Sequence, residues 1–456
     1  MVRESKLSVN PHSLFSGKGL LVSAPDAVQA PEYIFFSARY GVNLETGSVP
    51  RTPEDLPNET RKMYSSSRYI DFEEWPITAQ TWWIYEAFRR ILEPLGGSVQ
   101  NLVRTNTYFR DLEKFPAMER ARAAILPVDP PPSTVLEVPF EFFPEGVDLA
   151  IEGVAVLSGG GSRDVIRSRL GTGSHYSWGI RTNEMVWVAG QTPSHPLTGR
   201  YVHQIGDLGL EGSHLVTGNH HVDEREGPVS AQAWITYRRI RTILEDAGAS
   251  LNDVTHEKVF LKSMQHLPAV ERVRREIYRP AEQAPPSLYV QVVTLGRALD
   301  CLMEVDVVAS SADRVIFPGP TDSLDRLSAA GSLGGPFLSL GGWVARDPKS
   351  KHVICGAEEL GERRKGLGGE ESSLAVQALW IYDALGIFLK EKRSSLEELV
   401  KIDIYVKKTA SVSALDAVHR TIFLSGPPAV SVIPMEALDP DPDVQIKICG
   451  TANRPE

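Results

Sequence analysis

The sequence predicts an α+β protein in which three related domains follow one another in a single chain. A seven-residue motif with Gln at its second place and Tyr at its seventh occurs at 79–85, 231–237 and 376–382. Its glutamines, Gln80, Gln232 and Gln377, are 152 and 145 residues apart, which is the length of a small domain and far beyond a solenoid period. Three such domains in one chain suggest a covalent trimer.

Each repeat is expected to contain the same run of strands and helices. The motif lies on a helix, and a strand ending in an aromatic residue follows it at 102–108, 254–260 and 399–405. A second helix then begins near Pro116, Pro268 and Val412. A Pro-Pro pair next opens a strand of alternating apolar residues, and a hydrophobic strand closes each repeat, at 149–156, 302–308 and 444–449. The three repeats are therefore expected to share one topology.

The middle repeat shows these elements most clearly. Residues 186–189 are typical of a strand that runs into a Gly/Pro turn at 190–193. Apolar side chains recur at helical spacing from Ala231 to Leu244, Gly248 is a natural stop, and 250–253 resemble a capping box. The order predicts α+β domains with two helices on one face of a mixed sheet, at residues 1–157, 158–315 and 316–456.

Composition narrows the class of partner. The chain has 456 residues, 42% of them hydrophobic and 23% charged, which suffices for one core per repeat. The net charge of −10 disfavours binding to a phosphate backbone, which needs a concentrated basic stripe. No stretch approaches the roughly 18 apolar residues of a membrane span, and the start lacks the apolar core of a signal peptide. We therefore expect a small-molecule partner, no nucleic acid, no membrane, and a cytoplasmic location.

No metal or organic cofactor is expected. The three cysteines show neither a CxxC pair nor a disulfide spacing. The segment 214–223 holds three histidines and an aspartate, a usable ligand set for zinc or iron, but it has no helical i, i+4 pair and is expected to be a polar loop. The Gly-rich runs at 158–162 and 366–369 match neither the Walker nor the dinucleotide pattern, and the first is typical of a linker.

The order of elements resembles that of the Rid/YjgF family. The resemblance rests on Tyr176-Ser177 ahead of the first strands, 189–191 at their turn, the connection 248–250, and 303–306 in the last strand. It is closest in repeat 2 and most distant in repeat 3. The family fold is a sheet with two helices, and three copies form a barrel-like trimer with pockets at the subunit interfaces. The resemblance implies three tandem Rid-like domains forming an intramolecular pseudo-trimer, monomeric or in a small homo-oligomer.

The resemblance also implies an activity. Active family members hydrolyse reactive imines or enamines to a carbonyl compound and ammonia, and use a last-strand glutamate and an N-terminal tyrosine. The glutamate position holds Glu304 in repeat 2, Ala150 in repeat 1 and Gln445 in repeat 3. The tyrosine position holds Tyr176 in repeat 2 and Phe15 in repeat 1. Repeat 2 is therefore expected to contribute the dominant pocket, whose other wall comes from a neighbouring repeat.

The carboxylate-binding arginine of the family is absent from its position. That position falls on Ser133, Ser287 and Ala429, and a serine cannot give planar bidentate recognition. Candidate replacements are Arg39, on a turn that aligns with 189–191, and Arg346 near the turn of repeat 3. A surface salt bridge is the alternative for each arginine.

We expect Glu304, Tyr176 and His175 to be the catalytic residues. Glu304 would activate water as acid or base, and Tyr176 or His175 would assist at nitrogen. The alternatives are a solvated strand carboxylate for Glu304 and a packed aromatic for Tyr176. Expected substrate-binding residues are Arg39, Gly190, Gln191 and Ser287, with backbone N–H groups at 190–191 holding developing negative charge.

Three function classes follow. The first is a hydrolytic deaminase of a small imine or enamine, such as an aminomuconate-like unsaturated amino acid, in which water attacks C=N and ammonia leaves. The second is a chorismatase-like enzyme acting on an enolpyruvyl ether. The third is a non-catalytic small-molecule binding protein on the same scaffold, which the missing arginine favours. Ammonia release separates the first class from the others, and pyruvate release separates the second.

Overall fold

The computed structural model describes residues 7–9, 23–65, 74–141, 143–157, 161–171, 176–216, 226–296, 300–319, 327–367, 369–408 and 411–455. Within these residues the strands form three mixed sheets, each accompanied by helices. The predicted α+β class is therefore confirmed. The sheets take their strands from consecutive parts of the chain, with one exception, β13.

Repeat 1 builds most of the first sheet, in the order β1-β2-β3-β7-β5-β6-β13 with β4 beside β7. Its strands are β1 (Leu7–Val9), β2 (Ala27–Ala30), β3 (Tyr33–Phe36), β4 (Arg39–Tyr40), β5 (Leu102–Phe109), β6 (Ser133–Glu137) and β7 (Leu149–Val156). Its helices are α1 (Asn58–Ser65), α2 (Trp75–Leu92) and α3 (Phe115–Ile125). The exception, β13 (Thr294–Leu295), comes from repeat 2 and pairs antiparallel with β6.

Repeats 2 and 3 form the other two sheets, in the orders β12-β11-β14-β10-β9-β8 and β15-β16-β17-β20-β18-β19. The strands of repeat 2 are β8 (Asp164–Val165), β9 (Gly179–Arg181), β10 (Met185–Val188), β11 (Val254–Leu261), β12 (Ser287–Gln291) and β14 (Met303–Ser310). Those of repeat 3 are β15 (Val315–Phe317), β16 (Gly331–Gly334), β17 (Phe337–Trp343), β18 (Leu399–Lys407), β19 (Ala429–Met435) and β20 (Ile446–Asn453). The helices are α4 (Glu226–Asp246), α5 (Leu267–Ile277), α6 (Ser373–Glu391) and α7 (Val412–Ile422).

Local chemistry explains the boundaries of these elements. Gly248 has a φ of +76°, the left-handed conformation in which helices end. The Ser250 hydroxyl accepts a hydrogen bond from Asn252 N–H, and the Asp253 carboxylate accepts from Ser250 N–H. The predicted capping box is therefore confirmed, and it fixes the entry into β11.

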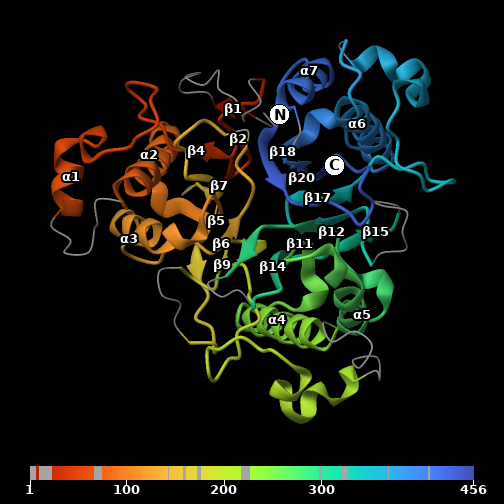
Figure 1. Ribbon diagram of the computed structural model, residues 1–456, viewed down its shortest axis with the longest axis horizontal. Helices are drawn as coiled ribbons and strands as arrows, with labels where there is room; N and C mark the ends of the chain where they lie inside the picture. The colour runs from red at the N-terminus through yellow and green to blue at the C-terminus, as the bar shows by residue number, and fades with distance from the viewer. Residues whose placement is uncertain are drawn as a thin grey trace.

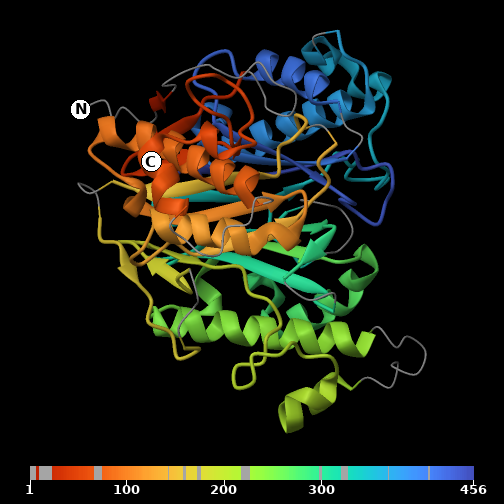
Figure 2. The same cartoon turned by 60° about the vertical axis from the view of Figure 1, so that its left-hand side comes forward.

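The three repeats surround a common centre, with their sheets inward and their helices outward (Figures 1 and 2). The turn after the first strands of each repeat packs on the Pro-rich strand of another. Gly190 N–H donates to the Ser133 carbonyl at 3.2 Å, and Ala38 N–H donates to Ser431 Oγ at 3.0 Å. A side chain at Gly342 would touch Leu288 at 3.0 Å. These contacts run in a cycle and define interfaces 1/2, 2/3 and 3/1 of a pseudo-trimer.

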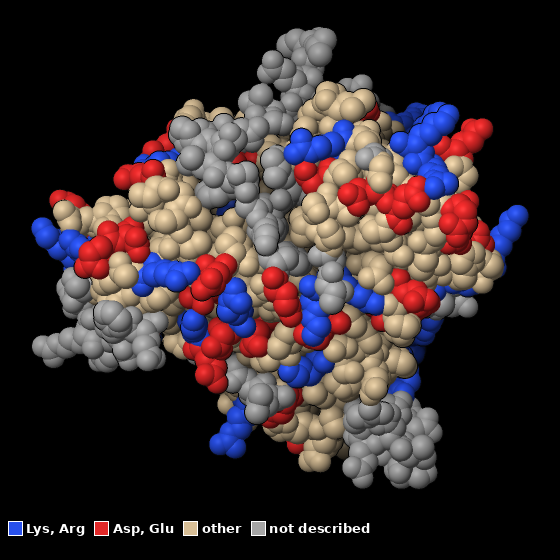
Figure 3. Space-filling model, turned by 45° about the horizontal axis from the view of Figure 1, so that its top comes forward, with Lys and Arg blue, Asp and Glu red and all other residues tan. Residues whose placement is uncertain are grey.

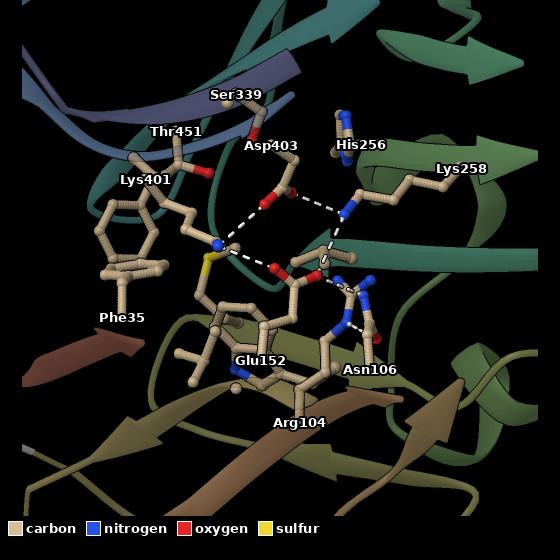
Figure 4. A pocket seen from close by; sticks show the side chains of 17 residues that line it. Phe35, Arg104, Asn106, Glu152, His256, Lys258, Ser339, Lys401, Asp403 and Thr451 are labelled. Carbon is tan, nitrogen blue, oxygen red and sulfur yellow. Dashed lines mark hydrogen bonds and ion pairs between the residues drawn. The ribbon is translucent and has the colours of Figure 1, made fainter. Parts of the chain in front are cut away.

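Four charged side chains form a closed ring at the centre (Figure 4). Lys258 Nζ is 2.7 Å from Asp403 Oδ2 and 3.9 Å from Glu152 Oε1, and Lys401 Nζ is 2.9 Å from Asp403 Oδ1 and 2.7 Å from Glu152 Oε2. The ring borders a cavity of about 60 Å³. Burial and the neighbouring Lys258 hold the pKa of His256 well below its usual value, so this histidine is neutral. Signs alternate around the ring, as buried charges require.

The surface and the helix layer are also informative. Figure 3 shows basic and acidic side chains interspersed over one face, without a continuous basic stripe.

In the described part of the chain one helix, α6, is long and apolar enough to cross a membrane, and 61% of its apolar window is buried inside the protein. Most of its apolar residues belong to the core of repeat 3, together with sheet residues such as Ile404 and Ile448, whereas Ile387 is exposed.

Candidate functional site

A cavity of about 610 Å³ lies at interface 1/2. Repeat 1 lines it with Leu112, just before α3, with Phe115 and Arg122 on α3, and with Ser133 and Val135 on β6. Repeat 2 lines it with Tyr176, Gly190, Tyr201 and Glu304, and with the exposed rim residues Arg200, His203 and Asp300. The cavity has the size of a small-ligand site and combines apolar walls with a few charged groups.

Glu304 is the buried acid of this cavity. It lies near the start of β14, opposite Phe260 on β11, and is only 4% exposed. Its carboxyl accepts a hydrogen bond from Val135 N–H on β6 of the other repeat. Burial raises the pKa of Glu304 to about 8, and the charge of Asp306 adds to the rise. The carboxyl is therefore mostly protonated at neutral pH, so it donates a proton before it accepts one.

Tyr176 lies beside this acid. Its ring packs edge-on against Trp178, with centroids 5.3 Å apart, and burial raises the pKa of the phenol, which stays protonated at neutral pH. Arg239 stands behind it on α4: its guanidinium lies 5.1 Å over the Trp178 ring and donates to Gln191 Oε1 at 3.2 Å. Repeat 2 therefore brings a phenol, a carboxyl and a guanidinium to one end of the interface.

Gly190 and Gln191, the two predicted turn residues, face opposite sides of their turn. Gly190 lines the cavity, and a side chain there would overlap the Glu304 carboxyl. Gln191 is fully buried and faces Arg239 instead. The expected role of their N–H groups in holding negative charge is wrong, because Gly190 N–H donates to Ser133 O and Gln191 N–H donates to Val305 O.

Two expected substrate-binding residues lie away from Glu304. Ser287 is at interface 2/3, where its hydroxyl bonds Arg274 at 2.9 Å and Glu257 at 2.8 Å. Arg39 takes the place of Gln191 in repeat 1, since it pairs with Ile151 as Gln191 pairs with Val305, and it forms an ion pair with Asp26. The turn that carries Arg39 packs on repeat 3 through the Ala38–Ser431 hydrogen bond, so Arg39 lies at interface 3/1 and not at the cavity of interface 1/2.

Of the remaining candidates, the structure describes Arg346 and His214. Arg346 forms a salt bridge with Asp439 at 2.9 Å and with Asp441 at 3.1 Å, but Arg346 and Asp439 are buried, so this is not the surface salt bridge of the alternative. His175 and Phe15 lie outside the described residues, as do His220, His221 and Asp223 of the suspected metal loop. His214, the described histidine of that loop, is 3.2 Å from Glu276. In the described part of the chain no group of three His, Cys, Asp or Glu side chains is placed to hold a metal ion.

Strand register corrects one predicted equivalence. Glu304 pairs with Phe260, Ala150 with Tyr108, and Lys447 with Tyr405. Lys447, and not Gln445, therefore occupies the acid position in repeat 3. The three interfaces thus carry a glutamate, an alanine and a lysine at equivalent places.

At interface 2/3, side chains occupy the place that corresponds to the Glu304 cavity. Arg274, fully buried, pairs with Glu257 and Glu271 and bonds the hydroxyls of Tyr289 and Ser287. Lys447 lies 3.4 Å from Asp439 and donates to the carbonyl of Tyr289. A groove of about 930 Å³ remains on the outer side, lined by polar residues such as Gln265, Arg275, Lys407 and Glu436.

Interface 3/1 is occupied in a different way. Ser23 Oγ lies 2.7 Å from Asp416 Oδ1 and 3.1 Å from His419 Nδ1. Ala150 stands at the acid position there and offers no proton. Interface 1/2 therefore differs from the other two, because an ionisable acid, Glu304, occupies the equivalent position there and borders a cavity.

Sequence reasoning missed Arg122. It lies on α3, is 1% exposed, forms an ion pair with Glu119, and lines the Glu304 cavity from the opposite repeat. The signal was available, because Glu-x-x-Arg occurs at 119–122 on α3 of repeat 1 and again at 271–274 on α5 of repeat 2.

The chain is similar to several known proteins. The family model described as Endoribonuclease L-PSP matches residues 166–311. A RutC family protein of Pyrococcus abyssi is 30% identical over 134 residues, which are 29% of this chain and 84% of the relative. TdcF of E. coli, solved with bound serine, is 22% identical over 33% of this chain and 99% of its own, with a TM-score of 0.26. A chorismatase structure covers 77% of this chain and 93% of its own at 12% identity and a TM-score of 0.45. The chain belongs to the Rid/YjgF family, also called the L-PSP or RutC family.

Proposed function

We propose that this protein is a hydrolytic deaminase of a small imine or its enamine tautomer, acting in the cavity at interface 1/2. The observation that carries the proposal is Glu304, a buried carboxyl with a pKa of about 8 in a cavity built by two repeats. A carboxyl with this pKa is suited to both proton donation and proton acceptance near neutral pH.

The reaction needs one water and proton transfers in both its addition and its elimination step. Glu304 first gives its proton to the carbon of an enamine or to the nitrogen of an imine, which leaves an electrophilic iminium carbon. The resulting Glu304 carboxylate takes a proton from the attacking water, so C–O forms and a carbinolamine results. Glu304 then gives this proton to the carbinolamine nitrogen, C–N breaks and ammonia leaves, and the carboxylate takes the hydroxyl proton, which yields the carbonyl compound and restores protonated Glu304. Tyr176, whose phenol stays protonated, donates a hydrogen bond at nitrogen in this proposal.

The cavity favours a small unsaturated substrate. Its walls include Phe115, Val135 and Tyr201, which suit a flat apolar body, and an aminomuconate-like unsaturated amino acid fits this description. The net charge of −10 and the interspersed surface charges disfavour an RNA backbone.

Ammonia release on an imine panel tests the proposal. Imines generated in situ from amino acids of increasing side-chain size are offered to the enzyme, and the uncatalysed rate is subtracted. Wild type is expected to release ammonia and carbonyl compound in equal amounts. Glu304→Gln is expected to lower turnover about 10²-fold or more, because an amide transfers no proton.

A matched control is Glu436→Gln, which makes the same change in the groove of interface 2/3 and is expected to leave turnover unchanged. Unaltered turnover in a folded Glu304→Gln protein would move the chemistry elsewhere. Release of pyruvate from an enolpyruvyl ether without ammonia release would replace deamination by the second function class.

A further inference from the structure

We infer that the substrate carries a carboxylate that binds Arg122, together with an apolar unsaturated body that occupies the aromatic part of the cavity. The inference rests on the proposed function only in taking this cavity as the substrate site. It assigns a specificity-determining role to a guanidinium that α3 of repeat 1 delivers across the interface to the acid of repeat 2.

The position of Arg122 supports this role. Its side chain is 1% exposed, yet it borders the cavity together with Ser133 and Tyr176. Glu119, one turn earlier on the same helix, forms an ion pair with it and orients the guanidinium. A guanidinium carries five N–H donors in a fixed planar fork, so one that a carboxylate already orients can also bind a second carboxylate.

The chain contains an internal comparison. Arg274 occupies the same place on α5 of repeat 2, and there a second carboxylate, Glu257, binds it with the Tyr289 hydroxyl. Strand pairing places Thr105 where repeat 2 has Glu257, and Val135 where it has Tyr289. The carboxylate and phenol that fill interface 2/3 are thus replaced by smaller groups at interface 1/2, and a ligand carboxylate takes the role of Glu257.

The charges near the cavity favour an anion. Arg239, Glu304, Glu119 and Arg122 all act on Tyr176 and so lie around it. Of the Arg, Asp and Glu residues that line the cavity, Arg122 and Arg200 are basic, Asp300 is acidic, and Glu304 is protonated at neutral pH. The lining therefore carries more positive than negative charge, and a carboxylate on the substrate reduces this excess.

The volume indicates the rest of the ligand. About 610 Å³ exceeds what a three-carbon oxo acid fills, and the remaining space is walled by Leu112, Phe115, Val135 and Tyr201. These side chains gain from contact with an aromatic or conjugated body rather than with a second charge.

Ligand binding tests the inference without any need for turnover. The probes are phenylpyruvate, its amide, and pyruvate, titrated calorimetrically into wild type, Arg122→Gln and Arg120→Gln. Arg120 is the matched control, since it is on the same helix, pairs with Glu74 and does not belong to the cavity lining. We expect wild type to bind phenylpyruvate at least tenfold more tightly than either its amide or pyruvate. Arg122→Gln is expected to lose at least tenfold in affinity for the acid and little for the amide, while Arg120→Gln matches wild type.

Equal affinity of wild type for acid and amide, or failure to bind phenylpyruvate, would overturn the inference, as would wild-type affinity in Arg122→Gln. If Arg122→Gln does not fold, a crystal structure of wild type with phenylpyruvate decides: a carboxylate on Arg122 supports the inference and any other placement contradicts it. If Glu304→Gln loses turnover but still binds phenylpyruvate, both proposals are supported. If wild type binds phenylpyruvate but releases no ammonia from any imine, the deaminase proposal is refuted and the inference about Arg122 is not.

Discussion

At the scale of single residues, the acid and the turn that faces it depend on each other. Gly190 has no side chain, and this absence leaves the space that the Glu304 carboxyl occupies. A hydrogen bond from Gly190 N–H to the Ser133 carbonyl holds Gly190 of repeat 2 against the Pro-rich strand of repeat 1. The glycine is therefore required by close approach and not by an unusual backbone angle.

Gly190→Ala is expected to displace the Glu304 carboxyl and to lower kcat/KM by about tenfold or more, because a misplaced catalytic group loses its alignment. The measurement is ammonia release under the conditions used for Glu304→Gln. Gly206→Ala is the control, since a side chain at that position meets nothing closer than 3.8 Å. Equal rates in the two variants would show that the carboxyl relaxes without loss.

The pKa of Glu304 also makes a stability prediction. A carboxyl has a pKa of about 4.3 in an unfolded chain, whereas burial raises that of Glu304 to about 8 in the folded protein. The folded state thus holds this proton more tightly, and the stability that results is complete below the unfolded value and is lost as pH rises through 8.

Glu304→Gln removes this dependence. Between pH 5 and pH 9 wild type is expected to lose a few kcal/mol of unfolding free energy relative to the variant, at about 1.4 kcal/mol per unit of pKa. Chemical denaturation at the two pH values measures the difference. Parallel pH curves for the two proteins would mean that Glu304 ionises at its ordinary pKa.

Sequence reasoning brought Glu304, Tyr176 and Gly190 together because they belong to one repeat and to one recognisable pattern. Arg122 escaped it because the other half of the cavity comes from a different repeat, and a single repeat carries no sign of which neighbour it meets. Gln191 was expected on the cavity although it lies on the opposite face, since successive residues of an extended chain point to opposite sides. Arg39 was expected there too, but its turn packs on repeat 3.

At the scale of elements, β7, β11 and β18 meet through the central ring of charges. Glu152 on β7 contacts the other two strands: it is 2.7 Å from Lys401 Nζ on β18 and 3.9 Å from Lys258 Nζ on β11. Removal of one member of such a ring leaves a buried charge without full compensation.

Glu152→Gln is therefore expected to lower the unfolding free energy by about 3–5 kcal/mol. Urea denaturation measures it, with Glu371→Gln as the control, because the Arg364–Glu371 pair is exposed and such pairs contribute about 0–1 kcal/mol. A loss below about 1 kcal/mol in Glu152→Gln, similar to the control, would show that the ring adds little to stability.

Periodicity and turn chemistry predicted most helices and strands, including the starts of α3, α5 and α7 near Pro116, Pro268 and Val412. Two features could not be predicted from periodicity or turn chemistry. The assignment of Gln445 instead of Lys447 is a slip of two residues, which keeps every side chain on the same face and so leaves the alternating pattern unchanged. The pairing of β13 with β6 joins two repeats, and local patterns do not specify partners so distant.

At the scale of the molecule, fusion has let three equivalent interfaces diverge. A homotrimer would change all three sites with each substitution, whereas here the equivalent positions carry Glu304, Ala150 and Lys447. One interface keeps a cavity with an acid, and ion pairs or small hydrogen-bonded groups occupy the corresponding places in the other two.

The pseudo-trimer uses its own interfaces internally, so we expect a mass of 50.2 kDa in solution. Light scattering coupled to size-exclusion chromatography measures it. A small multiple would point to an added interface on the outer surface, and a trimer of chains would contradict an arrangement in which all three sheet interfaces are satisfied within one chain.

The central claim is that a protonated Glu304 at interface 1/2 drives hydrolysis of a C=N bond, and the pH dependence of enzymatic ammonia release tests it most directly. After subtraction of the uncatalysed rate, kcat/KM for wild type is expected to fall above an apparent pKa of about 8, while Glu304→Gln shows a low rate without this inflection. Wild-type rates in Glu304→Gln, or an unchanged inflection in that variant, would contradict the account.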